Sequence, residues 1–146
     1  NSLAPDRCTW SFDHRGVLMR VLGGPGSRAA RIENRVGEPA ANPYLFILSQ
    51  LVSGFDGIDN KRDPGPRSEE PYSAERAHLP KTLSEALDAL EASDLMRTEL
   101  GPVFMDYFLK LKRSEAGRFA QWLDANKLAA GDEPTAWEQD EYFDFF

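Results

Sequence analysis

The chain has one cysteine, two histidines and no long apolar run among its 146 residues. The single Cys8 excludes an internal disulfide and a zinc site built from several cysteines, and two histidines exclude a histidine-rich metal cage. No segment approaches the roughly 20 apolar residues that a membrane-spanning helix needs. The N-terminus also lacks the charged, apolar and small-residue order of a signal peptide. We therefore expect a cytoplasmic protein without a membrane partner.

Positive charge is scarce as well. Lysine and arginine number 17 against 24 acidic residues, which gives a formal net charge of -7. Binding to a nucleic-acid backbone needs a clustered positive surface, so no nucleic-acid partner is expected. The composition, 41% hydrophobic and 28% charged, is ordinary for a folded domain. The first residue is Asn1 rather than methionine, and we expect an imposed boundary there rather than a natural start.

The predicted secondary structure changes near Asn42. Before it, β-like runs are separated by turn clusters, and after it the apolar spacing is helical. We predict an α+β fold of one domain, 1–146, with short antiparallel strands in a strand-rich part (1–41) and a mostly helical part (42–146). The expected strands are 7–12, 17–22 and 30–36. The expected helices begin at Asn42-Pro43, Thr82, Ser93, Val103 and Thr135.

Several side-chain positions follow from these patterns. The helix 44–55 is apolar nearly all round, so it should be buried, with Gly54 and Gly57 marking its end. Gly16 should supply an unusual backbone angle in the turn 13–16, and Cys8 should be a small buried strand residue. The helix from Val103 to Leu123 should bury one set of apolar residues, namely Val103, Tyr107, Phe108, Leu111, Phe119 and Trp122.

The run Arg31-Ile32-Glu33-Asn34-Arg35 carries the most chemical information. In a strand, Arg31, Glu33 and Arg35 share one face at roughly 7 Å steps. One interpretation is a solvated face whose charges neutralise each other. The other is a binding surface, because arginine suits forked contact with phosphate and a carboxylate suits a hard divalent cation. If the strands are neighbours, Arg15 and Arg20 could join this patch, and such a cluster would favour a polyphosphate or acidic ligand.

The motifs in sequence order resemble the glutamine synthetase family. They are Asp13-His14-Arg15 with Arg20, the run 31–35, Ala41-Asn42-Pro43-Tyr44-Leu45, and Ser53-Gly54-Phe55-Asp56-Gly57-Ile58. The helix start at 79–83 and the aromatic tail from Trp137 to Phe143 resemble the branch of γ-glutamyl-polyamine and related amine ligases. The resemblance covers the whole chain, but only as the C-terminal part of a longer catalytic domain.

The resemblance implies roles for individual residues. Glu33 matches a ligand of the metal ion, Mg²⁺ or Mn²⁺, that accompanies ATP. Arg35 matches a catalytic residue that contacts the substrate glutamate and the phosphoryl group in transit. Arg15, also catalytic, matches a nucleotide-binding residue, as do Arg20, Arg31 and, less specifically, Arg28. The implied reaction phosphorylates the side chain of glutamate, and ammonia or an amine then displaces phosphate.

Departures from the family pattern limit these expectations. His14 replaces the usual asparagine and is expected to make a local hydrogen bond, and Tyr72 is not equated with a regulated tyrosine. The remaining metal ligands and the substrate loop of the family match nothing here, so we expect the isolated chain to be inactive. Its partners would be the missing N-terminal part of the same enzyme and further copies of that enzyme in a homo-oligomeric ring. The enzyme would belong to nitrogen metabolism. A stand-alone, non-catalytic interaction module is the alternative.

Overall fold

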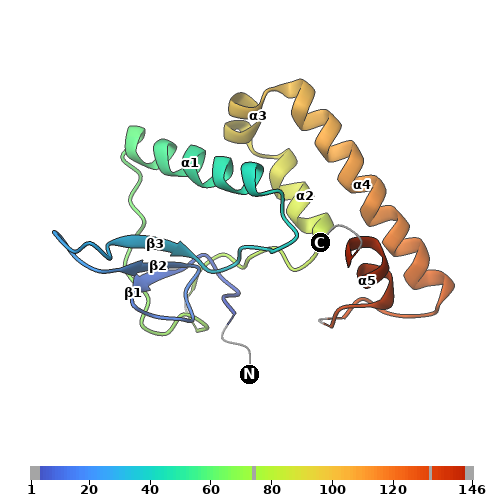
Figure 1. Cartoon of the computed structure of the whole chain (residues 1–146), viewed down its shortest axis with the longest axis horizontal. Helices are drawn as coiled ribbons and strands as arrows, with labels where there is room; N and C mark the ends of the chain where they lie inside the picture. Colours follow the sequence, from blue (N-terminus) through green and yellow to red (C-terminus); the bar gives the residue numbers. More distant parts are fainter. Residues whose placement is uncertain (1–3, 74, 132, 144–146) are drawn as a thin grey trace. The chain divides into compact units, whose positions relative to one another are not determined.

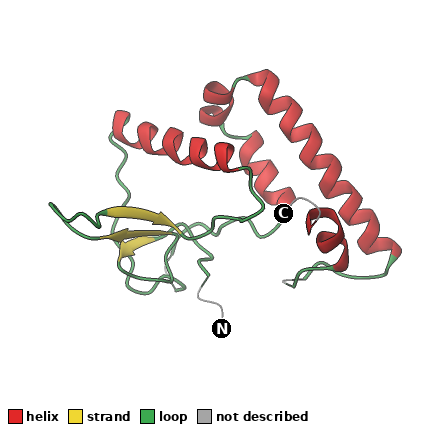
Figure 2. Ribbon diagram, viewed as in Figure 1, coloured by secondary structure: helices red, strands yellow, loops and turns green. Residues whose placement is uncertain are grey.

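The computed structural model describes residues 4–73, 75–131 and 133–143. They form two compact units, Asn1–Leu79 and Pro80–Phe146, which we describe separately. The first contains β1 (Trp10–Phe12), β2 (Met19–Leu22), β3 (Arg31–Asn34) and α1 (Pro43–Asp59) (Figure 1). The second contains α2 (Leu83–Glu91), α3 (Asp94–Leu100), α4 (Pro102–Ala125) and α5 (Ala136–Tyr142) (Figure 2). The α+β class predicted from the sequence is confirmed.

The strands lie in the order β1-β2-β3 and are shorter than predicted. β2 and β3 are antiparallel, which places Arg20 opposite Glu33. The connection between them starts at Gly23, which has φ +72°, and a Cβ there would lie 2.8 Å from the backbone nitrogen of Ala30. Only glycine fits this tight return of the chain.

β1 and β2 are parallel, so the antiparallel arrangement predicted for the strands is wrong for this pair. The chain turns back through Asp13, whose φ is +51°, and whose N–H donates to the carbonyl of Val21 at 3.0 Å. Gly16 was expected to provide the unusual angle, but its φ is not positive. Glycine is needed there for space, since a Cβ would lie 2.7 Å from Cγ of Pro71.

The segment after α1 is fastened along β1 by hydrogen bonds. The indole Nε1 of Trp10 donates to the carbonyl of Gly65, and the N–H of Ser68 donates to the carbonyl of Trp10, both at 2.9 Å. The N–H of Cys8 donates to the carbonyl of Ala77. Cys8 itself lies outside the strands and is exposed, which corrects the expectation of a buried strand residue.

Helix α1 begins as predicted, with the side chain of Asn42 accepting from the N–H groups of Tyr44 and Leu45. It continues past both glycines to Asp59, and its C-terminal turn is held by contacts with the following residues. The N–H of Asn60 donates to the carbonyl of Asp56, and the Arg62 guanidinium binds the Asp56 side chain. The hydrogen bond from Arg62 lowers the pKa of Asp56.

The burial predicted for α1 is wrong, because none of its residues is buried. One side meets the sheet region, where the side-chain amide of Asn34 donates to Gln50 at 2.9 Å. The other side exposes six large apolar residues: Tyr44, Ile47, Leu48, Leu51, Phe55 and Ile58. Within the described residues of its own unit, Asn1–Leu79, this apolar face has no covering layer.

The second unit has its core between α2 and α4. Leu87, Met105 and Leu109 are buried, and Leu90, Met96 and Leu100 surround them. Thr82 and Ser93 cap α2 and α3 as predicted. Half of the predicted α4 core is wrong, since Val103, Tyr107 and Leu111 are exposed. The face that meets α2 and α3 is instead that of Met105 and Leu109.

Helix α5 opens with a reciprocal capping box between Thr135 and Glu138, as its sequence predicts. It lies against the C-terminal half of α4: the rings of Phe119 and Trp137 are 5.2 Å apart, and the Tyr142 hydroxyl donates to the Glu115 carboxylate. Among the described residues, no helix combines the length and apolar character that a membrane span requires.

Candidate anion-binding site

The face of the sheet that carries Arg20 and Glu33 is the candidate site. Cross-strand pairing aligns Ser11, Arg20 and Glu33, so these side chains share one face. Nη1 of Arg20 lies 3.4 Å from one oxygen of Glu33, and Nε of Arg35 lies 3.1 Å from the other. Glu33 therefore bridges two guanidiniums, and the side chains of Arg20 and Arg35 are only 16% and 20% exposed.

The two arginines keep free donors in this enclosed setting. Nε of Arg20 and Nη1 of Arg35 are buried and have no hydrogen-bond partner among the described residues. A buried guanidinium N–H without an acceptor is costly, so an anionic ligand that supplied an acceptor would stabilise the cluster. Asp13, which no sequence pattern marks as a site residue, accepts from Nη2 of Arg20 at 2.5 Å.

The other predicted site residues are not joined to this cluster by contacts. Arg15 and Arg28 are exposed, on the turn after β1 and in the β2–β3 connection. Arg31 shares the face of Glu33 by strand alternation, but it is exposed and donates from Nη1 to the carbonyl of Ala29. His14 makes the local hydrogen bond expected of it, since its Nδ1 accepts from the N–H of Gly16 at 3.0 Å.

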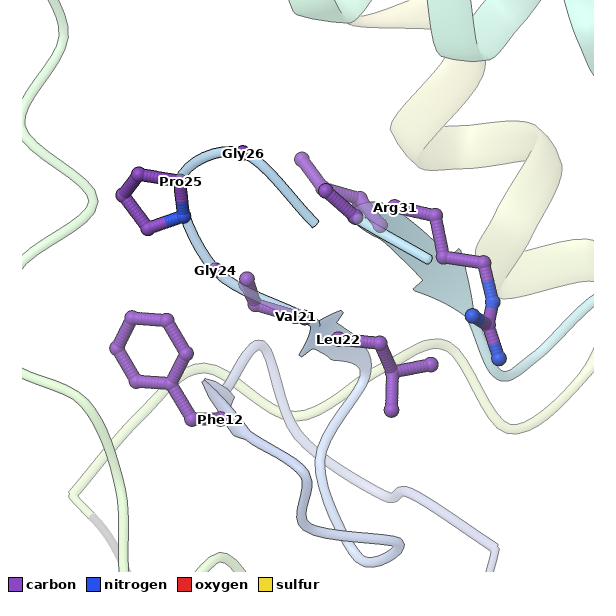
Figure 3. Close-up of a pocket in the computed structure, with 10 residues that line it drawn as sticks. Phe12, Val21, Leu22, Gly24, Pro25, Gly26 and Arg31 are labelled. Atoms are coloured by element: carbon purple, nitrogen blue, oxygen red, sulfur yellow. The ribbon is translucent and has the colours of Figure 1, made fainter. Parts of the chain in front are cut away.

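The opposite face of the sheet has different chemistry. Phe12, Val21 and Ile32 are cross-strand neighbours there, beside an open, mainly apolar hollow of about 400 Å³. Figure 3 shows the ring of Phe12 and that of Pro25 on one side of the strands and the guanidinium of Arg31 directed away from them. The hollow opens on the face opposite Arg20 and Glu33, and Arg31 is the one charged residue among the described residues that line it.

A divalent cation would need more ligands than the described residues bring together. No group of three acidic, histidine or cysteine residues suited to a metal occurs in the part of the chain that the structure describes. Mg²⁺ and Mn²⁺ prefer about six oxygen-rich ligands, and both Glu33 oxygens already face guanidiniums. The described residues therefore do not make a complete metal site, and Glu33 could contribute one carboxylate at most.

Comparison with known proteins decides what kind of domain carries this face. The family described as "Glutamine synthetase, catalytic domain" matches residues 1–130. The chain belongs to the glutamine synthetase family. Its fold agrees with a solved structure described as "GmaS/ADP complex-Conformation 1", with a TM-score of 0.65, 31% identity, and coverage of 97% of this chain and 30% of that one.

Similar sequences in the family include both amine-type and glutamine synthetases. The chain is 51% identical to a gamma-glutamylanilide synthase of Acinetobacter sp, over 98% of this chain and 29% of that protein. It is 36% identical to a glutamine synthetase of Archaeoglobus fulgidus, over 97% of this chain and 28% of that protein. The chain thus spans less than a third of the length of these relatives. The sequence-based family assignment, including its amine-ligase branch, is confirmed.

Proposed function

We propose that this chain is the phosphate-binding part of an ATP-dependent ligase that joins glutamate to an amine. The observation that carries the proposal is the Arg20–Glu33–Arg35 cluster, with buried N–H donors still free on both arginines. Phosphoryl transfer is promoted chiefly by positioning and by positive charge around the transferred group. A preformed pair of guanidiniums supplies both, and Glu33 keeps the pair together when no ligand is present.

We assign different ligands to different arginines of this face and its neighbouring segments. Arg20, with Arg15, Arg28 and Arg31 from the neighbouring turn, connection and strand, contacts the nucleotide. Arg35 contacts the glutamate carboxylate and the phosphoryl group in transit. In the first step a γ-carboxylate oxygen of glutamate attacks the terminal phosphorus of ATP, and ADP leaves. In the second step the amine nitrogen attacks the acyl carbon, loses a proton, and phosphate leaves. Glu33 supplies one carboxylate to a metal site that residues outside this chain complete.

The comparisons support parts of this proposal. The name of the solved neighbour includes ADP, which supports nucleotide use. Identity to a gamma-glutamylanilide synthase, 51% against 36% for an archaeal glutamine synthetase, favours an amine over ammonia as the acceptor. A cytoplasmic location and assembly into a ring belong to the same proposal. The isolated chain is expected to be inactive, because it offers one candidate metal ligand and the family's reaction needs a complete site.

The deciding experiment compares the 146-residue chain with the protein encoded by the complete reading frame around it. We expect phosphate release that depends on glutamate and an amine from the longer protein, and none from the chain. In the longer protein, Arg35→Lys should lower kcat at least about tenfold, since lysine loses the forked contact. The matched control is Arg67→Lys, at an exposed arginine whose ion pair is with Glu69.

The same experiment tests the alternative of a non-catalytic interaction module. A complete reading frame that adds no further residues upstream would contradict the ligase and favour the module. So would a longer protein that releases no phosphate with glutamate and any of ammonium, aniline or a polyamine. Equal activity of the Arg35→Lys and Arg67→Lys variants would remove Arg35 from the proposed catalytic group.

A further inference from the structure

Asp13 has no assigned role in the proposed reaction, yet its carboxylate contacts the guanidinium of Arg20. Oδ1 of Asp13 accepts from Nη2 at 2.5 Å, while Nη1 lies 3.4 Å from Glu33. The guanidinium is therefore held between two carboxylates that approach its two terminal nitrogens from different parts of the chain. The one remaining nitrogen, Nε, is buried and has no partner among the described residues.

The backbone of Asp13 has a defined conformation, and this sets the point from which its side chain extends. Its φ of +51° is in the left-handed region, which aspartate and asparagine enter more readily than other non-glycine residues. Its N–H also donates to the carbonyl of Val21, the residue after Arg20. The turn and the strand that carries Arg20 are thus tied together, so the backbone of Asp13 is held beside the strand that carries the guanidinium.

We propose that Asp13 is a positioning residue that holds the guanidinium of Arg20 in the orientation that receives an anionic group. The functional part of this inference depends on the proposed contact between Arg20 and the nucleotide phosphates. The opposite idea is that Asp13 occupies the place of a phosphate group and moves aside when the ligand binds. The fixed backbone of Asp13 argues for positioning, and the two ideas predict changes of opposite sign in nucleotide affinity.

The first experiment uses the ¹⁵N-labelled 146-residue chain and observes the side-chain signals of Arg20. Two ion pairs on Nη1 and Nη2 should slow rotation of these groups and give separate proton signals. Asp13→Gly keeps the left-handed backbone accessible and removes the carboxylate, so rotation should become fast. Asp59→Asn is the control, at an exposed carboxylate without an ion pair among the described residues. An unchanged Arg20 spectrum in Asp13→Gly overturns the positioning role.

The second experiment measures the KM for ATP in the longer protein. Asp13→Gly should raise KM roughly tenfold, the order expected for losing a charge-assisted contact, with a smaller change in kcat. Asp13→Asn keeps the shape and the backbone preference and should recover part of the loss. A lower KM in Asp13→Gly overturns positioning in favour of a phosphate substitute. Free rotation of Arg20 with an unchanged KM instead contradicts the proposed nucleotide contact of Arg20, so the two failures are distinguishable.

Discussion

Gly16 and Gly24 both lie next to turns, but the space around them differs. A Cβ on Gly16 would lie 2.7 Å from Cγ of Pro71 and 3.1 Å from Cε2 of Tyr72, whereas a Cβ on Gly24 would meet nothing within 4 Å. We expect Gly16→Ala to lower the free energy of unfolding by about 1–3 kcal/mol, because a proline ring gives way poorly. Gly24→Ala is the matched control and should change it by less than about 0.5 kcal/mol. Denaturant unfolding followed by circular dichroism measures both, and equal effects would contradict the close contact.

Among the site residues, strand alternation alone was enough to place Glu33 and Arg35 on one face. Arg20 could be added only as a possibility, because its position opposite Glu33 depends on the register of β2 against β3. Asp13 could not be found, since its contact with Arg20 depends on the left-handed turn and on the parallel course of β2. Periodicity predicts what shares a strand face, whereas contacts between segments depend on the path of the turns between them.

Helix starts were the most predictable elements, because capping is a local interaction. Asn42, Thr82, Ser93 and Thr135 all cap the helices expected of them. The buried face of α4 was not predictable in the same way. Apolar residues occur on more than one side of this helix, and only contact with α2 and α3 selects Met105 and Leu109. Local signals thus fix where a helix begins, but the packing partner decides which face is buried.

The docking of α5 on α4 predicts a dependence on pH. Burial, followed by the hydrogen bond to the Glu115 carboxylate, raises the pKa of the Tyr142 phenol above its ordinary value of 10.0. The folded state therefore favours the neutral phenol. Its contribution to stability is fully present below pH 10 and is lost as the pH rises further. Denaturant unfolding should show this loss in the wild-type chain at alkaline pH.

Tyr142→Phe is the variant that isolates this contribution. It removes the bond to Glu115 and should lower the free energy of unfolding at neutral pH by about 1 kcal/mol. The variant should then lose less stability than the wild type on going above pH 10, since the other tyrosines titrate in both proteins. Parallel stability curves for the two proteins would contradict the assigned bond.

At the scale of the whole molecule, the exposed face of α1 explains why burial was predicted wrongly. Apolar residues on every side of a helix indicate that the helix is covered, but they do not say by what. In this chain, which spans 28–30% of the length of the three proteins compared above, Leu51 is 51% exposed and Tyr44 83% exposed. The sequence pattern is therefore consistent with a covering layer that lies outside the described residues of the first unit. An apolar pattern on every side of a helix therefore does not show that the covering residues belong to the same chain.

An uncovered apolar face of this size should make the isolated chain self-associate. The exposed residues Tyr44, Leu48, Leu51, Phe55 and Ile58 repeat at alternating steps of four and three, the spacing along which helices pair. Leu51→Glu places a charge at the centre of this row and should shift the chain towards the monomer at a given concentration. Sedimentation velocity over a concentration series measures the shift.

Ser53→Glu is the matched control for this prediction. Ser53 is also exposed on α1, and two residues at about 100° each place it on the opposite side of the helix from Leu51. It adds the same charge to the same helix, so it should leave self-association unchanged if the apolar row is the contact surface. Equal effects of the two substitutions would indicate that net charge, rather than this face, governs association. A wild-type chain that stays monomeric at every concentration would show that the apolar row of α1 does not pair with a second copy, even though it is exposed.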